Sequence, residues 1–201
     1  MPKVVDHEQR RAELAAAVWR LVSTEGLDAI TVRRVAAEAG WSTGALVHYF
    51  ADKESLVLFA FRTVADRVGS RVERLAQDSS DPLELARALL VEGLPLDADR
   101  RAEVRVWFAF LGLALTRPSL AKAQRVGYRA WRSRLEQLLR QAQLEGRINP
   151  EVDCELEAAE LVALVDGLSV QATFEPRTFS SERLVALVDA RLERLVVASQ
   201  R

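Results

Sequence analysis

Apolar residues recur at three- and four-residue spacing along almost the whole chain of 201 residues, and no convincing two-residue alternation occurs. Ala, Leu, Glu and Arg dominate between the breaks, and all four residue types favour helices. The chain holds only 9 Gly and 6 Pro, which is too few for a loop-rich protein. We therefore expect an all-α fold of about nine helices.

Side chains that accept hydrogen bonds from a first helical turn mark the expected helix starts. The clearest start is Asp81-Pro82-Leu83-Glu84, which combines an N-cap, a first-turn proline and an acidic third position. Other N-cap candidates are Asp6 with Gln9, Thr31, Ser42 or Thr43, and Asp52. The expected helices cover residues 6–25, 32–38, 43–49, 53–77, 83–93, 98–116, 119–145, 153–174 and 181–198.

These helices divide the chain into two parts. Residues 1–52 hold three short helices and form a compact amino-terminal unit, and residues 53–201 form a larger bundle. The long helix that starts at Lys53 connects them. We expect two domains with separate functions.

Composition excludes several classes of protein. Cys154 is the single cysteine, so an internal disulfide framework and a cysteine-based zinc site are excluded, and a reducing compartment is favoured. No apolar run reaches the ~18 residues that span a bilayer, and residues 1–6 lack the apolar stretch of a signal peptide. We expect a cytoplasmic protein with no membrane partner, no metal and no cofactor.

The net charge of −1 argues against nucleic-acid binding, unless a local patch makes the contact. Residues 100–147 are strongly basic, residues 151–193 are acidic, and residues 1–62 are balanced. The basic stretch admits a nucleic-acid interpretation, but a solvated helix face is favoured because Glu136 lies among the arginines. The arginines concerned are Arg125, Arg129, Arg132, Arg134 and Arg140.

The segment from Thr31 to Phe50 is the most informative part of the sequence. The helix after Thr31 is too short to be stable alone in water, so it must pack on a neighbour. Gly40 can adopt a left-handed conformation that turns the chain sharply, and Ser42 can cap the next helix at once. This arrangement predicts a helix-turn-helix, whose second helix enters the DNA major groove.

The same segment, extended to Leu56, resembles the DNA-binding signature of the TetR family of transcriptional repressors. Two departures from the family occur: Trp41 replaces a small aliphatic residue, and Val47 replaces a common tyrosine. They change the packing beneath the turn and remove one DNA contact. The matched positions are Thr31, Arg33, Val35, Ala36, Ala39, Gly40, Ser42, Thr43, Gly44, Leu46, Tyr49, Phe50, Lys53 and Leu56.

The resemblance implies DNA-contacting residues in and around the second helix. Thr43 can bond a base or a phosphate, Ala45 can meet a thymine methyl group, and Lys53 offers a positive charge at a helix start. Plainer roles stay open: Leu46 and Phe50 as core residues, Thr31 as a cap, Trp41 as a core plug, Arg34 and His48 as surface residues. The full set of DNA-binding candidates is Thr31, Arg33, Arg34, Ser42, Thr43, Gly44, Ala45, Leu46, His48, Tyr49 and Lys53.

Residues 100–195 resemble the betaine/choline-regulator (BetI-type) branch of this family, most clearly at Val165-Asp-Gly-Leu168. The resemblance implies a small-molecule effector, and aromatic side chains can hold a cationic one. The alternative is that these aromatic residues only pack in the core. A polar partner inside the cavity, such as Gln171 or Glu92, would be needed to favour a pocket instead. The pocket candidates are Trp107, Phe108, Phe110, Leu111, Tyr128, Trp131 and Gln171.

The last two helices carry apolar stripes that are expected to pair in a homodimer. In this family two helices from each subunit form a four-helix bundle about a two-fold axis, which implies a near-palindromic operator. Packing within one chain is the alternative. The interface candidates are Leu161, Val165, Leu168, Leu184, Leu187, Val188, Leu192 and Leu195.

We expect a ligand-responsive repressor rather than an enzyme. No phosphate-cradling glycine loop and no nucleophile elbow occur in the sequence. Cys154 lies between two acidic residues, which raise the pKa of a thiol rather than activate it. An interaction protein whose helix-turn-helix no longer binds DNA is the third hypothesis.

Overall fold

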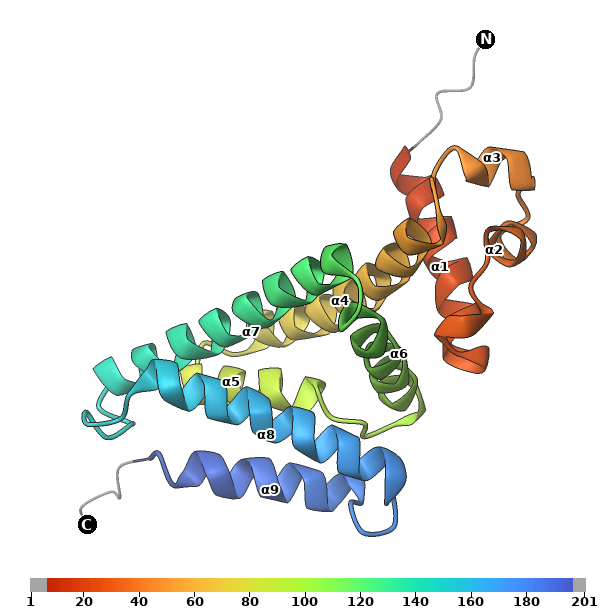
Figure 1. Ribbon diagram of the computed structural model, residues 1–201. Helices are drawn as coiled ribbons and strands as arrows, with labels where there is room; N and C mark the ends of the chain where they lie inside the picture. Colours follow the sequence, from red (N-terminus) through yellow and green to blue (C-terminus); the bar gives the residue numbers. More distant parts are fainter. Residues whose placement is uncertain (1–6, 197–201) are drawn as a thin grey trace. The chain divides into compact units, whose positions relative to one another are not determined.

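The computed structural model describes residues 7–196, and within that range the chain is helical with no β-strand (Figure 1). The all-α expectation is therefore confirmed. A short 3-10 helix, Leu27–Ala29, was not predicted. The α-helices of the described range are α1 His7–Glu25, α2 Val32–Ala39, α3 Thr43–Val47, α4 Lys53–Asp78, α5 Pro82–Glu92, α6 Ala98–Ala114, α7 Pro118–Leu144, α8 Cys154–Phe174 and α9 Ser181–Glu193.

Most of the predicted helix starts carry the hydrogen bonds expected of N-caps. Asp81 Oδ1 accepts from the backbone N–H of Leu83 at 2.9 Å and of Glu84 at 3.3 Å. Asp52 Oδ1 accepts from the N–H of Ser55 at 2.7 Å, which lowers the pKa of that carboxyl. The proposed cap at Asp6 lies outside the described residues.

The last helix is shorter than predicted, because α9 ends at Glu193 and not at residue 198. Beyond it the chain pairs with the loop that follows α7. The N–H of Asn149 donates to the carbonyl of Leu195 at 3.2 Å, and Ile148 forms an isolated antiparallel bridge with Val196. These bonds replace the helical ones that the sequence pattern predicted.

The chain forms two compact units. The first runs through Arg67 and includes Arg105–Ala123, and the second consists of Val68–Val104 and the residues from Gln124 onward. The expected boundary between residues 52 and 53 separates two expected functions rather than these two compact units, and it stays a prediction.

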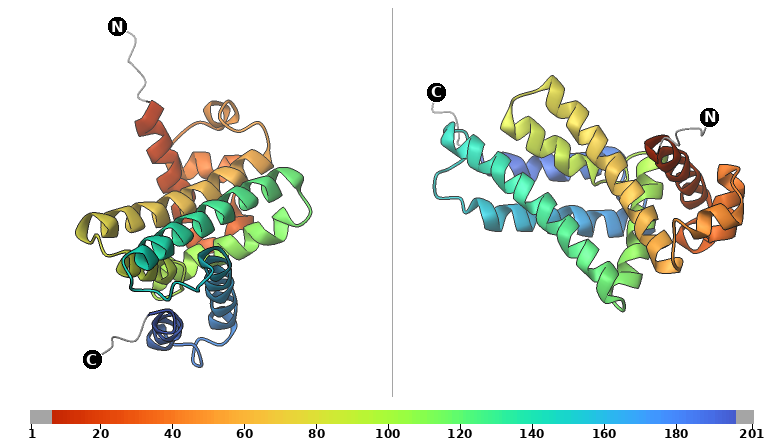
Figure 2. Two further views of the ribbon diagram at one scale, coloured as in Figure 1. Left: turned by 90° about the vertical axis from the view of Figure 1, so that its left-hand side faces the viewer. Right: turned by 90° about the horizontal axis from the view of Figure 1, so that it is seen from above.

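In the first unit α1 packs on α2, and α2 packs on α3 (Figure 1). The core of this unit draws residues from α1, α2, α3 and α4 and from the α6 segment that belongs to it, including Leu14, Val35, Leu46, Leu56 and Phe110. In the second unit α5 packs against both α8 and α9, which run side by side in Figure 1 and Figure 2.

Candidate functional site

The turn between α2 and α3 has the geometry of a Schellman C-cap. Gly40 adopts φ 71° and ψ 25°, a left-handed conformation that glycine takes without steric cost. The N–H of Trp41 donates to the carbonyl of Ala36 at 2.8 Å, and the N–H of Gly40 donates to that of Ala37 at 3.2 Å. These two bonds end α2 and aim the chain into α3, as the sequence predicted.

The helix α3 is only five residues long, so its position depends on a cap and an anchor. Ser42 Oγ accepts from the N–H of Ala45 at 3.1 Å, which satisfies one free donor at the helix start. Leu46 is fully buried in the core of the first unit. The opposite face of α3 therefore stays in solvent.

Ten of the eleven candidate DNA-binding residues have exposed side chains or backbone, as a DNA surface requires. The exception is Leu46, whose burial favours the core role that the sequence left open. The exposed candidates are Thr31, Arg33, Arg34, Ser42, Thr43, Gly44, Ala45, His48, Tyr49 and Lys53.

Ion pairs neutralise part of the positive charge near this surface. Arg34 pairs with Glu25, and Arg20 pairs with Glu38. The pKa of the Arg34 guanidinium is raised because it hydrogen bonds to Glu25. Among the described residues, Arg33 and Lys53 make no ion pair, so their full charge is available to a phosphate.

The pocket candidates fall into two sets, one in each unit. In the first unit Phe110 is fully buried and stacks on Phe61, with ring centroids 3.9 Å apart and planes 11° apart. Trp107 and Phe108 are partly exposed neighbours with centroids 5.0 Å apart, and Leu111 is also partly exposed. Phe110 thus has the core environment that was the alternative interpretation.

In the second unit the Tyr128 hydroxyl donates to Asp166 Oδ2 at 2.7 Å, joining α7 to α8. Burial raises the pKa of the Asp166 carboxyl to about 6. In the part of the chain that the structure describes, this carboxylate makes no ion pair. Asp166 lies within the quoted Val165-to-Leu168 motif, but sequence reasoning had given it no role.

Trp131 lies one turn beyond Tyr128 on α7 and packs on a glycine. A Cβ built on Gly93 would stand 3.1 Å from Trp131 Cη2 and 2.8 Å from Val165 Cγ1. Ser169 Oγ donates to the carbonyl of Gly93 at 3.1 Å, so α8 holds the same point of the chain. Gln171, by contrast, is exposed, and its amide reaches only the carbonyl of Gly167.

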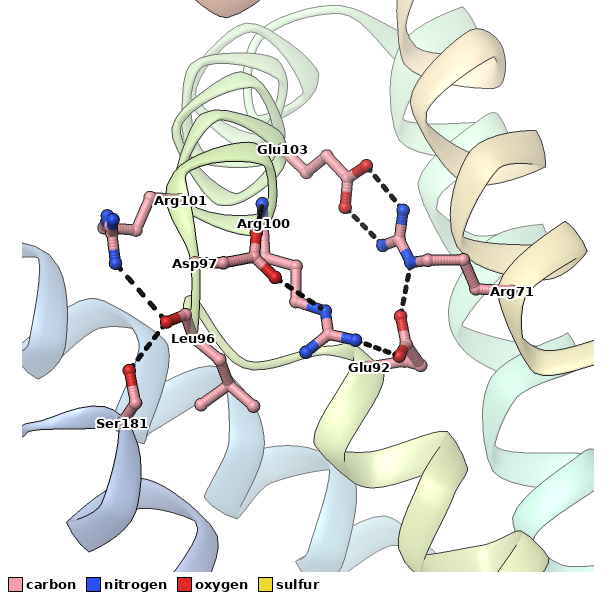
Figure 3. Close-up of polar contacts among 8 residues, drawn as sticks. All are labelled: Arg71, Glu92, Leu96, Asp97, Arg100, Arg101, Glu103 and Ser181. Atoms are coloured by element: carbon pink, nitrogen blue, oxygen red, sulfur yellow. Dashed lines mark hydrogen bonds and ion pairs between the residues drawn. The ribbon is translucent and has the colours of Figure 1, made fainter. Parts of the chain in front are cut away.

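Next to this region, a buried ion network joins α4, α5 and α6 within the second unit (Figure 3). Glu92 accepts hydrogen bonds from Arg71 and Arg100, and Glu103 accepts two from Arg71. The side chains of Glu92 and Glu103 are both 5% exposed. Both carboxylate oxygens of Glu92, one of the two polar partners that an aromatic pocket was expected to need, accept from arginines.

Ser181 Oγ and Arg101 Nη1 both donate to the carbonyl of Leu96, at 2.7 and 3.4 Å (Figure 3). Ser181 holds the loop between α5 and α6 to the start of α9, and Arg101 ties the same carbonyl to α6. The sequence offered no sign of the Arg71 contacts or of the Ser181 anchor, because these partners lie 21 to 85 positions apart along the chain.

The basic run of α7 is largely a solvent-exposed face. Arg125, Arg129 and Arg134 are exposed, and Arg140 pairs with Glu136 one turn away. Arg132 lies over the Tyr128 ring, 5.8 Å from its centroid. This arrangement favours the solvated-face interpretation.

Seven of the eight interface candidates lie in the core of the second unit, and only Leu187 is exposed. A different apolar face of α8 and α9 is uncovered in the single chain. Sequence reasoning named Leu187 of this face but missed its α8 members, because α8 is apolar on nearly every side. The exposed members are Leu156 at 59%, Val170 at 42%, Phe174 at 78% and Leu187 at 37%.

Other chemistry has little support in the described residues. Burial is the main cause that raises the pKa of the Cys154 thiol. Residues 7–196 hold no cluster of His, Cys, Asp and Glu suited to a metal ion. The same part of the chain holds no helix with the length and apolar character needed to cross a membrane.

A helix-turn-helix with an exposed second helix, in a chain that also carries a larger helical unit, defines a class of DNA-binding transcriptional regulators. Residues 14–59 match the family described as "Bacterial regulatory proteins, tetR family". Residues 82–197 match the family described as "BetI-type transcriptional repressor, C-terminal". The chain belongs to the TetR family of bacterial transcriptional regulators, and its carboxy-terminal part is of the BetI type.

Relatives extend over nearly the whole chain. The transcriptional regulator PksA of Bacillus subtilis is 32% identical over 201 residues, which is 100% of this chain and 97% of PksA. BetI of Serratia proteamaculans is 29% identical over 93% of this chain and 92% of its own length. Both relatives are named as helix-turn-helix transcriptional regulators.

Solved structures show the same fold. A transcriptional regulator from Rhodococcus sp. Rha1 is 34% identical, with a TM-score of 0.76 over 92% of this chain and 95% of its own. A regulator from Saccharomonospora viridis, solved in complex with choline, is 22% identical and has a TM-score of 0.83. That match covers 95% of this chain and 100% of the other.

Proposed function

We propose that this regulator is a repressor that binds a near-palindromic operator as a homodimer and responds to a small molecule. The observation that carries the DNA-binding part is the exposed face of α3, which follows the left-handed turn at Gly40 and is anchored from below by Leu46. Thr43 and Ala45 face the bases, while Arg33, His48, Tyr49 and Lys53 hold phosphates. Its place is the cytoplasm, where chromosomal DNA lies.

The homodimer forms through the exposed apolar face of α8 and α9. A patch that contains Phe174, Val170 and Leu156 is costly to leave in water, and a second copy of the same face covers it isologously. Two α3 helices related by a two-fold axis then read two half-sites.

The effector site is centred on Asp166, Tyr128 and Trp131 in the second unit, and its ligand is a small organic cation. A half-buried carboxylate without a cationic partner favours positive charge, and two nearby aromatic rings add cation–π attraction. The choline complex of the Saccharomonospora regulator agrees with this choice. Trp107, Phe108, Leu111 and Gln171 stay pocket predictions, whereas full burial favours the core role of Phe110.

The effector acts through its different affinity for the DNA-binding and the non-binding conformations. Fluorescence anisotropy with DNA from upstream of the protein's own gene tests the repressor, with an unrelated duplex as control. Nanomolar, selective binding is expected. Weak, nonselective binding to this upstream DNA, followed by failure to select any operator from genomic fragments, would favour the hypothesis of an interaction protein that no longer binds DNA.

Calorimetric titration with choline tests the effector class. The matched control ligand is 3,3-dimethylbutan-1-ol, which has the same shape and no charge. We expect choline to bind at least about tenfold more tightly than the alcohol, and Asp166→Asn to reduce the difference to the part that the aromatic rings supply. Equal affinities would contradict the cation site and leave the regulator intact.

A further inference from the structure

We infer that Arg10 of α1 is an additional binding residue for a DNA phosphate, and that Trp41 positions it. This inference rests on the proposed DNA-binding function. The Arg10 guanidinium carbon lies 5.4 Å from the centroid of the Trp41 ring, within the range of a cation–π contact. The Trp41 ring is held in turn by Tyr49, with centroids 5.5 Å apart and planes at 64°.

The charge of Arg10 is available, unlike that of two other arginines of the first unit. Arg20 and Arg34 are each paired with a glutamate. In the described set of side chains Arg10 makes no ion pair, and its guanidinium lies over the aromatic ring. The side chain is also exposed. Arg10 therefore carries an unneutralised positive charge into solvent.

The contact with an aromatic ring suits phosphate binding for a chemical reason. A ring attracts the cation through its π face but accepts no conventional hydrogen bond from the in-plane N–H groups of a guanidinium. Those N–H groups form a planar fork that matches two phosphate oxygens. The ring thus holds the side chain in place and leaves its donors for a ligand.

The position of this pair points to DNA as the source of the phosphate. Trp41 directly precedes Ser42, the N-cap of α3, so Arg10 lies beside the start of the helix proposed to enter the major groove. A phosphate contact at this point sets the register of α3 on the duplex without reading the sequence. It also gives Trp41 a purpose that the usual small aliphatic residue could not serve.

Salt-dependent DNA binding by five proteins tests the inference: the wild type, Arg10→Ala, Arg11→Ala, Trp41→Leu and the Arg10→Ala/Trp41→Leu double variant. The probes are the selected operator in a ~30-base-pair duplex and a mixed-sequence duplex of equal length. Arg11→Ala is the matched control, because it removes the same charge from the next exposed position of α1.

For Arg10→Ala we expect about tenfold weaker binding and a salt slope shallower by about 2, which is one phosphate for each subunit of the dimer. Arg11→Ala should match the wild type. Trp41→Leu should shift the slope in the same direction, and the loss in the double variant should be smaller than the sum of the two single losses, because both changes remove the Arg10 contact. Unfolding midpoints should confirm that each variant is folded.

Two results would overturn the inference. One is wild-type binding with an unchanged slope in Arg10→Ala, and the other is an equal loss in Arg10→Ala and Arg11→Ala. Failure of the wild type to bind either duplex would instead reject the proposed function, and the phosphate site with it.

Discussion

Arg71 and Glu103 are joined by two hydrogen bonds, from Nη1 to Oε1 at 2.9 Å and from Nη2 to Oε2 at 2.5 Å. This fork ties α4 to α6 within the second unit. The hydrogen bonds to Glu103 are the main cause that raises the pKa of the Arg71 guanidinium. Since Glu92 also depends on Arg71, one side chain satisfies two carboxylates that are almost fully buried.

Replacing Arg71 by Met should lower the free energy of unfolding by about 3 kcal/mol, because two buried carboxylates lose the guanidinium that they share. Urea unfolding at fixed protein concentration measures the change. Arg87→Met, which breaks a more exposed pair with Asp189, should cost less than about 1 kcal/mol. Similar losses in both variants would show that burial does not set the strength of the network.

Gly40→Ala should destabilise the protein by about 1 kcal/mol, because alanine is strained at φ 71°. A Cβ at this position meets no atom within 4 Å, so backbone strain alone accounts for the effect. Gly40→Asn should cost less, since asparagine tolerates this conformation. Unfolding and operator affinity should be measured on the same variants. An Asn variant that is as unstable as the Ala variant would refute the explanation by backbone strain.

Gly93→Ala should destabilise by about 1–3 kcal/mol for a different reason, namely overpacking against Val165 and Trp131. Val165→Ala should restore part of the loss by making room. Gly112→Ala is the control, since a Cβ there meets no atom within 4 Å and alanine favours a helix. Thermal unfolding compares the stability of Gly93→Ala with that of Gly112→Ala. Unchanged stability in Gly93→Ala would mean that Val165 and Trp131 move easily to make room.

Asp166 should make stability fall as pH rises. Its pKa is raised from 3.8 to about 6 in the folded chain, so the folded state holds the proton more tightly than the unfolded state. Its stabilising contribution is complete below pH ~4 and is lost as pH rises through ~6. The free energy of unfolding of Asp166→Asn should therefore exceed that of the wild type by about 1 kcal/mol at pH 8, a value reduced for solvent screening. Near pH 4 the two free energies should be equal.

Tyr128→Phe supplies the companion test. The hydroxyl of Tyr128 donates to Asp166 and lowers the pKa of that carboxyl, so its removal should steepen the loss of stability with pH. Urea midpoints across the pH range measure both variants. A wild type that gains stability over Asp166→Asn between pH 4 and 8 would show that the carboxylate is stabilised, not penalised, by its surroundings.

Phe174→Asp should weaken the homodimer with little cost to the folded chain, because the side chain is 78% exposed. Light scattering after size-exclusion chromatography should show a monomer at concentrations where the wild type is a dimer. Leu144→Asp places the same charge at a side chain that is 90% exposed on α7 and should leave the dimer intact. A dimer that persists in Phe174→Asp would locate the interface elsewhere.

Local signals in the sequence predicted the helices and the turn of the candidate DNA-binding site. The turn at Gly40 and the caps at Ser42 and Asp81 form hydrogen bonds that span no more than five positions, so the local spacing alone contains these interactions. The last helix was the exception, because its end depends on Asn149 from a distant loop.

Long-range contacts could not be predicted in the same way. Arg71 and Glu103 are 32 positions apart, and nothing in their local sequence marks them as partners. The face of α8 was ambiguous for another reason. Leu161 and Val170 are equally apolar, so periodicity could not tell which faces the core and which faces solvent.

The glutamates that pair with Arg20 and Arg34 have a consequence for how the protein finds its operator. Nonspecific affinity depends almost wholly on unneutralised positive charge, and these pairs reduce it. A bacterial chromosome offers millions of competing sites, each of which would otherwise hold some of the protein. A DNA-reading surface with few free charges therefore leaves more molecules unbound and able to reach the correct sequence.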